Sequence, residues 1–353
     1  MTQPYERLPS HRFWSSAVTA VAPHELDPIV DFPLRIGKRD RVSTIGSCFA
    51  QHLSRFLRRS GMRYFVAELP PERMSKEEAK ERTYGVFSAR YGNVYTVRQA
   101  VQLFDRAFGA FEPVEEAWWR VDGRVVDPLR PRVEPGGFED LDALRRDRAV
   151  HLAAVRRVFL ESNVLVFTLG LTEAWVDTRD GTVLPLAPGV AAGRFEHSRH
   201  AFVNFTVSEV TADLVAFAER IQGVNPKGHI LLTVSPVPLV ATYEPRHVLV
   251  STVHSKSILR VAAAEAEARL PCVHYFPAYE IVTAPGLADR YFADDLRQVT
   301  AAGVAHVMRV FARHCFPGAK TEPPSAQATG GIELQHRLLE ELFCDELELE
   351  PAR

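Results

Sequence analysis

A turn that could hold a nucleophile lies within residues 41–61, where the chain reads RVSTIGSCFAQHLSRFLRRSG. A short apolar strand runs through Gly46, Ser47 and Cys48 into a pattern of helical spacing, and Gly61 supplies a helix stop. Ser47 and Cys48 are therefore predicted at a helix start. The first-turn N–H groups there favour a thiolate and offer donors to a developing oxyanion.

The same residues have a second interpretation, which involves no chemistry. Gly-Ser is also an ordinary turn and N-cap, and a free cysteine is usually a small buried hydrophobic residue. The segment by itself leaves both interpretations open, and the elements around it have to be considered.

Composition excludes several classes of protein. The chain has 353 residues, of which 46% are hydrophobic and 24% charged, and its net charge of -2 gives no electrostatic support for nucleic-acid binding. No stretch approaches the roughly 18 apolar residues of a membrane span, and the N-terminus lacks an apolar signal segment. We expect a cytoplasmic protein without a cofactor. No metal site or disulfide is expected from the scattered cysteines, Cys48, Cys272, Cys315 and Cys344.

Apolar strand-like runs alternate with helical patterns, which is typical of a parallel sheet with helices on both faces. Strands are predicted at Val42 to Ile45, Val164 to Leu169, His229 to Val234 and, more weakly, Cys272 to Phe276. Helices are predicted at residues 97–108, 141–161, 207–221, 255–269 and 300–314. The first three strands end in small or polar residues. Because ligands bind beyond the carboxyl ends of such strands, these endings predict one crevice.

The domain organisation follows from shifts in composition. We predict an N-terminal extension at 1–40, an α/β domain at 41–316 with insertions at about 111–137 and 178–204, a linker at 317–331 and an acidic amphipathic helix at 332–353. The helix either packs back on its own domain or docks a protein partner or second copy through residues 332–349.

The sequence resembles a known family over nearly its whole length. Gly46-Ser47-Cys48-Phe49-Ala50 is the name-giving motif of the GSCFA domain family, which resembles a divergent, SGNH/GDSL-like branch of hydrolases. Other segments are similar to its proteobacterial members: 91–96, 168–175, 233–237, 255–257, 275–280 and 294–297. The resemblance implies a three-layer, SGNH/flavodoxin-like α/β fold with a parallel sheet, two insertions and a C-terminal tail helix.

The resemblance also implies a set of site residues. Its Gly-x-nucleophile spacing puts Cys48, and less favourably Ser47, in the position of the catalytic serine. Threonine 172 stands where such enzymes usually have asparagine. The implied oxyanion and substrate-binding residues are Gly92, Asn93, Gly170, Thr172, Glu173 and Lys256.

The chain departs from the SGNH-type pattern in its last block, where those enzymes have Asp-x-x-His. Asp295-Leu296-Arg297-Gln298 has the aspartate and the spacing, but Gln298 occupies the place of the histidine. Glutamine takes up no proton near neutral pH and cannot be a general base. Asp295 either orients a histidine from elsewhere or caps the helix that follows.

Three histidines are candidates for the missing base. His247 follows the third strand at the edge where Cys48 lies and is the first candidate. His254 is predicted to cap a helix start, and His200 to reach over the crevice from the second insertion.

These residues point to a hydrolase or acyltransferase that forms an acyl-Cys48 intermediate from an ester or thioester. The expected substrate is a small-molecule or carbohydrate acyl ester, such as one used in polysaccharide assembly. Trp118, Trp119 and Trp175 could stack on a sugar or fill a core. The alternative is a non-hydrolytic binding or scaffold protein of the same fold that recruits a partner through its acidic C-terminal helix.

Overall fold

The computed structural model describes residues 3–316, which form two compact units. One consists of residues 38–276 and the other of residues 3–37 together with 277–316. The predicted domain at 41–316 therefore spans parts of both units. The predicted linker, the acidic helix with its partner surface at 332–349, and Cys344 lie outside the described residues.

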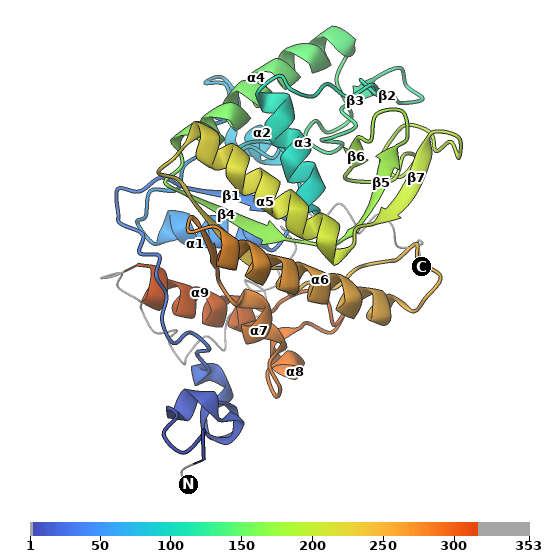
Figure 1. Ribbon diagram of the computed structural model, residues 1–353. Coiled ribbons are helices and arrows are strands. Elements are labelled where there is room, and N and C mark those ends of the chain that lie inside the picture. Colours follow the sequence, from blue (N-terminus) through green and yellow to red (C-terminus); the bar gives the residue numbers. More distant parts are fainter. Residues whose placement is uncertain (1–2, 317–353) are drawn as a thin grey trace. The chain divides into compact units, whose positions relative to one another are not determined.

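A parallel sheet forms the centre of the unit of residues 38–276 (Figure 1). Its strands are β1 (Val42–Gly46), β4 (Val164–Leu169), β8 (His229–Val234) and β9 (Val273–Tyr275), in the order β1-β4-β8-β9. Every residue of β1 and β4 is buried, which explains why both are continuous apolar or small-residue runs. The four predicted strands are confirmed.

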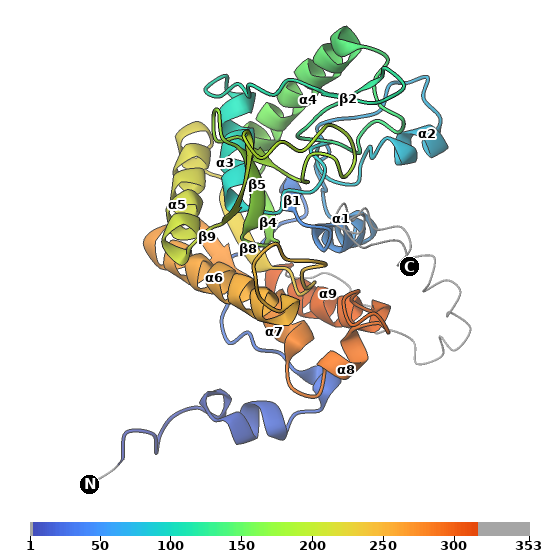
Figure 2. The same cartoon turned by 90° about the vertical axis from the view of Figure 1, so that its right-hand side faces the viewer.

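Helices cover both faces of this sheet, as predicted. The helices of this unit are α1 (Ala50–Arg59), α2 (Lys76–Glu81), α3 (Val97–Ala107), α4 (Leu141–Glu161), α5 (Val207–Val224) and α6 (Val248–Arg269), of which α2 buries no residue. Figure 2 shows α5 and α6 on one side of β4 and β8, and α1 on the other. The prediction of a helix starting at Ser255 is wrong, because α6 begins at Val248.

The order of the strands defines where a ligand would enter. Tyr64 bridges Val42 in parallel on the side of β1 that faces away from β4, where the Val42 N–H donates to the Arg63 carbonyl at 3.0 Å. One neighbour of β1 in the sheet is therefore the segment at Tyr64, and the other is β4. The direction in which the chain adds strands to the sheet reverses between β1 and β4. In doubly wound sheets, such a switch point is the usual binding crevice.

The two insertions form small antiparallel sheets. In the first, β2 (Trp118–Trp119) pairs with β3 (Val125–Val126) in a hairpin around Asp122-Gly123. The second contributes to a sheet of β5 (Glu173–Asp177), β6 (Val183–Leu184) and β7 (His200–Asn204), in the order β6-β5-β7.

The core between the sheet and its helices is aromatic and aliphatic. Phe167 on β4 and Phe159 on α4 both pack edge-on against Phe217 on α5, with ring centroids 5.7 and 5.9 Å apart. Burying a side chain of this size stabilises the fold by about 1.5–3 kcal/mol. This packing fixes β4, whose carboxyl end carries part of the candidate site.

The other unit is helical. It contains α7 (Ala278–Thr283), α8 (Ala288–Tyr291) and α9 (Ala301–Cys315), with short helical segments at Ser10–Arg12, Ser15–Thr19 and Pro23–Glu25. His306 joins its two chain segments, because its ring nitrogens contact the Tyr291 hydroxyl at 2.7 Å and the Leu26 carbonyl at 2.8 Å. Within residues 3–316, every helix is too short or too polar to cross a bilayer.

Candidate functional site

The site is built around the end of β1, where Gly46 touches β4. The Ser47 N–H donates to the Thr168 carbonyl at 3.0 Å. Gly46 has φ +129°, and a Cβ placed on it would lie 2.2 Å from the Thr168 carbonyl oxygen. Only glycine fits this contact, so the first residue of the motif is explained by the close approach of two strands.

Cys48 lies in the turn between β1 and α1. The Ala50 N–H donates to the Ser47 carbonyl and the Gln51 N–H to the Cys48 carbonyl, so the turn leads directly into the helix. Cys48 is 4% exposed and Ser47 is 3% exposed. The Ser47 Oγ is buried and forms no hydrogen bond with a residue of the described part of the chain. The predicted strand-to-helix junction is thus present, and both candidate nucleophiles are buried in it.

The segment that contains Gly92 and Asn93 crosses the end of β1. The Val94 N–H donates to the Gly46 carbonyl at 2.9 Å, and the Tyr91 hydroxyl donates to the Thr44 carbonyl. Gly92 has φ +69°, a left-handed conformation that favours glycine, and Asn93 is 3% exposed. These bonds hold the second turn of the site, at Gly92-Asn93, against the first turn, at residues 46–48.

The third turn of the site follows β4, and its residue Gly170 contacts both of the other turns. The N–H groups of Gly170 and Leu171 both donate to the Tyr95 carbonyl at 3.1 Å. A Cβ on Gly170 would lie 3.1 Å from the Ser47 Cβ. The buried Lys256 donates from its Nζ to the Gly170 carbonyl at 2.6 Å, so this predicted substrate contact holds the turn in place.

The hydrogen bonds of Thr172 differ from those of an oxyanion donor, the role that the esterase pattern implies for it. Its hydroxyl donates to Asn204 Oδ1 at 2.7 Å, and its N–H donates to Ser255 Oγ at 3.0 Å. Asn204 in turn donates to Glu244 at 2.7 Å. Because the hydroxyl proton is already engaged, Thr172 ties β5, β7 and α6 together, and we do not count it among the oxyanion donors.

The three candidate histidines lie on two elements, α6 and β7. His247 is the exposed N-cap of α6, and its Nδ1 accepts the Leu249 N–H at 3.1 Å. His254 is exposed in the second turn of α6, so the expectation that it caps a helix start is wrong. His200 is buried at the start of β7, and its Nδ1 accepts the Glu196 N–H at 3.0 Å. In His247, this bond leaves Nε2 as the nitrogen that could exchange a proton with solvent or substrate.

Asp295 and Gln298 belong to the helical unit. The Asp295 Oδ1 accepts the N–H groups of Arg297 and Gln298 at 3.0 and 2.9 Å, which closes a local turn. The expectation that Asp295 caps the next helix is wrong, because Thr300 is the N-cap of α9 and accepts the Gly303 N–H. Its predicted role in orienting a histidine stays a prediction.

A cavity of about 290 Å³ begins at Tyr95 and Leu171, the residues that join the second and third turns. Its wall is mainly aromatic and aliphatic, and includes Trp175, Phe202, Tyr243, Leu184, Leu186 and Leu239. The Glu173 carboxylate also lines it, and burial raises the pKa of this group above its usual range. Cys48 and Ser47 are not among its lining residues.

The three tryptophans have different surroundings. Trp175 packs edge-on against Tyr243, with ring centroids 4.8 Å apart, in the wall of the cavity. Trp118 is 3% exposed and fills a small core with Val126 and Leu184, whereas Trp119 is 61% exposed. Of the two roles expected for these residues, Trp175 has the position suited to stacking and Trp118 fills a core.

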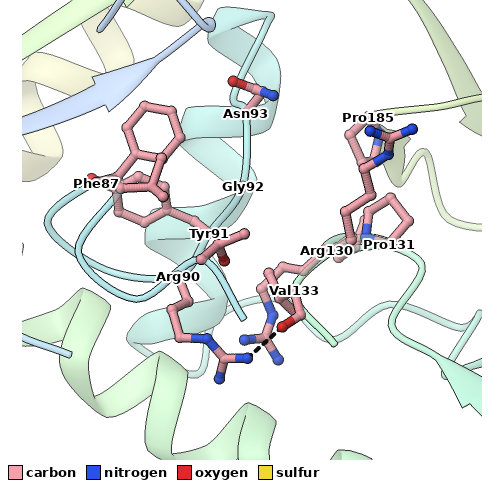
Figure 3. A pocket seen from close by; sticks show the side chains of 13 residues that line it. Phe87, Arg90, Tyr91, Gly92, Asn93, Arg130, Pro131, Val133 and Pro185 are labelled. Atoms are coloured by element: carbon pink, nitrogen blue, oxygen red, sulfur yellow. Dashed lines mark hydrogen bonds between the residues drawn. The ribbon is translucent and has the colours of Figure 1, made fainter. Parts of the chain in front are cut away.

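Sequence reasoning missed a group of buried arginines beside Gly92 and Asn93. Figure 3 shows Arg90 and Arg130 in the pocket that these two residues help to line. Both arginines pair with Asp147, at 2.7 and 2.9 Å. A third, Arg106, lies on the buried face of α3. Its place among apolar residues at helical spacing was the available sequence signal.

His52 was also missed. It lies on α1 one turn after Cys48, is 8% exposed and packs edge-on against Phe49 at 5.5 Å between ring centroids. Burial, assisted by the nearby Arg55, lowers the pKa of His52 to about 3. At neutral pH this histidine is therefore uncharged.

A comparison with known proteins gives one family. The model of the GSCFA family matches residues 41–311, more than three quarters of the chain. No curated protein matches the sequence.

Proposed function

We propose that this chain, which belongs to the GSCFA family, is a hydrolase or acyltransferase that forms a thioester between an acyl group and Cys48. The observation that supports this most is the meeting of three turns at the switch point of the sheet. The Gly46 carbonyl binds the second turn, Tyr95 binds the third, and Gly170 lies against Ser47. Such a convergence brings a nucleophile and several N–H groups together, as acyl transfer requires.

The reaction has two steps. In the first, the Cys48 thiolate attacks the acyl carbon, the C–O or C–S bond of the substrate breaks, and the leaving alkoxide or thiolate takes up a proton. In the second, water or an acceptor hydroxyl attacks the thioester, loses its proton, and the C–S bond to Cys48 breaks. Hydrolysis and transfer differ only in the second nucleophile.

The developing oxyanion needs donors. The Gly92 N–H forms no hydrogen bond with a described residue and lies in the turn that is bound to Gly46. The backbone N–H of Cys48 and the Asn93 amide complete the proposed set, because the N–H groups of Ala50 and Gln51 are already engaged within the turn. Each such donor typically contributes about 2.7–4 kcal/mol to the stability of the transition state.

His247 is the proposed acid and base. Its Nδ1 is engaged by the Leu249 N–H, which fixes the neutral ring in the form that carries a proton on Nε2. A thiol needs less help than a serine hydroxyl, because sulfur is intrinsically the stronger nucleophile. His247 would then mainly protonate the leaving group, and His200 and His254 are the next candidates.

The aromatic cavity suggests the class of substrate. Its wall combines Trp175 and Tyr243 with aliphatic residues, and one buried carboxylate, Glu173, can accept hydrogen bonds from hydroxyl groups. Aromatic faces of this kind stack on sugar rings or cover acyl chains. We therefore propose an acylated carbohydrate as the substrate.

A binding protein without turnover is the second candidate. Gln298 favours it, because this residue stands where SGNH-type enzymes have their histidine and cannot transfer protons. The acidic C-terminal segment that was expected to recruit a partner lies outside the described residues. In this case the cavity would bind a carbohydrate that is not cleaved.

Intact mass spectrometry after incubation with an activated acyl ester separates the two. We expect the wild-type protein to gain the mass of one acyl group and Cys48→Ser to gain none. Ser47→Ala should still form the adduct, and His247→Ala should form it but release the acyl group more slowly. Absence of any adduct and of turnover would favour the binding protein, and an adduct lost only in Ser47→Ala would move the nucleophile to Ser47.

A further inference from the structure

A small polar cavity next to the Gly92-Asn93 turn has an unusual wall. It has a volume of about 30 Å³, which is enough for one or two water molecules. Two buried arginines, Arg106 and Arg130, line it together with Asn93 and Gln99. Buried arginines are normally paired with carboxylates, so the partners of these two decide whether the cavity carries unbalanced charge.

Arg106 has no such partner. It is 7% exposed on α3, and its guanidinium forms no ion pair or hydrogen bond with a residue of the described part of the chain. Burial lowers the pKa of Arg106 to about 10, against an opposing attraction from Asp127. An arginine stays charged at neutral pH even so. A buried, unpaired cation is costly unless something outside the protein neutralises it.

Arg130 is only partly satisfied. Its Nε and Nη2 donate to Asp127 Oδ2 at 3.0 and 2.9 Å, and Nη2 also reaches Asp147 at 2.9 Å. Its Nη1 is buried without a hydrogen-bond partner among the described residues. Asp127 is shared with Arg148 at 3.2 Å, and Asp147 is shared with Arg90. The nearby carboxylates are therefore already divided among other arginines.

We propose that this cavity binds a carboxylate of the substrate between Arg106 and Arg130. The proposal rests on the proposed function, which it narrows to carbohydrate esters that bear a carboxylate, such as uronic acids. Arg106 lacks a direct carboxylate contact among the described residues, so a carboxylate of the ligand would supply its ion pair. A planar carboxylate also fits the fork of a guanidinium and the small volume better than a phosphate, which is larger and carries up to two charges.

The position of the cavity suits a single extended ligand. It shares Tyr91 and Asn93 with the pocket of Figure 3, and Gln99 with the aromatic cavity. A sugar stacked near Trp175 could therefore direct an acidic substituent past Gln99 toward Arg106. The proposed oxyanion turn lies beside this path.

Isothermal titration of the full chain with glucuronate, glucose and inorganic phosphate tests the proposal without any ester. We expect glucuronate to bind roughly tenfold or more tightly than glucose, and more tightly than phosphate. Arg106→Gln should lose this preference. Arg98→Gln is the matched control, because Arg98 lies on the same helix but pairs with Asp213 at 2.8 Å. It should bind like the wild type.

Equal binding of glucuronate and glucose by the wild type would overturn the proposal, and this comparison does not depend on the folding of a variant. Tighter binding of phosphate would assign the site to a phosphate-bearing ligand and would also refute it. A thermal melt of Arg106→Gln checks that any loss of binding is not loss of fold. No acyl group is transferred in this assay, so it tests the carboxylate site separately from the reaction. An acyl-Cys48 adduct without glucuronate binding would support the proposed function and refute the carboxylate site.

Discussion

Glycines decide the geometry of the site at the level of single residues. Gly46 and Gly170 are needed because another chain segment occupies the space where a side chain would begin. The motif around Gly46 could be recognised in the sequence, but its reason, the contact with the Thr168 carbonyl, required the neighbouring strand. The same is true of Lys256, whose bond to the Gly170 carbonyl joins residues 86 positions apart; its expected role as a substrate contact stays a prediction.

Gly170→Ala should disrupt the site more than the fold. The new Cβ would lie 3.0 Å from the Tyr95 carbonyl oxygen and 3.1 Å from the Ser47 Cβ, so the third turn must move away from the first. We expect a loss of stability of about 1–3 kcal/mol and a loss of acyl-adduct formation of at least tenfold. Chemical denaturation and the rate of adduct formation measure the two effects.

Gly223→Ala is the control for this substitution. Gly223 lies in α5 with no atom within 4 Å of an added Cβ, so alanine should leave adduct formation unchanged and slightly increase stability. If Gly170→Ala formed the adduct as fast as Gly223→Ala, the turn at Gly170 would have no part in the reaction.

The roles of the histidines could not be derived from local sequence. Each of His200 and His247 accepts a backbone N–H two to four residues away in the chain, and such bonds depend on where a helix or strand begins. Arg106 was missed for a related reason. An arginine at an apolar position of a helix is usually taken as a long side chain reaching the surface, and only the packing shows that it stays buried.

At the level of elements, the strands were predictable and one helix boundary was not. The strands are short buried apolar runs bounded by turns, and their length favours a strand over a helix. The first turns of α6 expose Leu249, Val250 and Val253, which are 63%, 54% and 54% exposed. Apolar residues on the solvent side obscure the helical periodicity, and this explains why α6 begins seven residues before its predicted start.

The stability of the fold should depend on pH through His52 on α1. Its pKa is about 3 in the folded protein and near 6.5 in the unfolded chain, so the unfolded chain takes up a proton first as the pH falls. The stability that the neutral ring contributes is therefore complete above about pH 6.5 and is lost progressively down to about pH 3. Over that window the loss amounts to roughly 2–4 kcal/mol, because each pKa unit corresponds to about 1.4 kcal/mol.

Urea denaturation of the wild type and His52→Gln at several pH values measures this contribution. The difference in unfolding free energy between the two proteins should shift in favour of the variant as the pH falls from 6.5 toward 4. A difference that stayed constant over this range would show that His52 is protonated equally in the folded and unfolded states.

At the level of the whole molecule, the α/β fold and its parallel sheet were predictable from the alternation of strand and helix patterns. The division into two units was not. Residues 277–316 join residues 3–37 through contacts such as that of His306 with Leu26, 280 residues apart in the chain. No local pattern indicates a pairing at that separation. The predicted tail helix lies outside the described residues and stays a prediction.

The aromatic cavity gives a prediction about substrates. Trp175→Ala removes its edge-on contact with Tyr243 and a large part of the cavity wall. We expect KM for an acylated sugar to rise about tenfold with a smaller change in kcat, because the proposed role of the indole is to bind the sugar away from the reacting atoms. Trp119→Ala is the control, since Trp119 is 61% exposed and does not line the cavity. An unchanged KM in Trp175→Ala would exclude this cavity as the sugar site.

The central claim is that Cys48 carries the acyl group, and peptide mapping after acid quenching tests it most directly. The wild-type protein is mixed with an activated acyl ester, quenched, digested and analysed by tandem mass spectrometry. Cys272 is an internal control, because it is less buried than Cys48 and would react first in a nonspecific acylation. We predict the acyl mass on Cys48, sensitive to hydroxylamine as a thioester is, with Cys272 unmodified. Acylation of Cys272 or Ser47 with Cys48 unmodified would contradict the account.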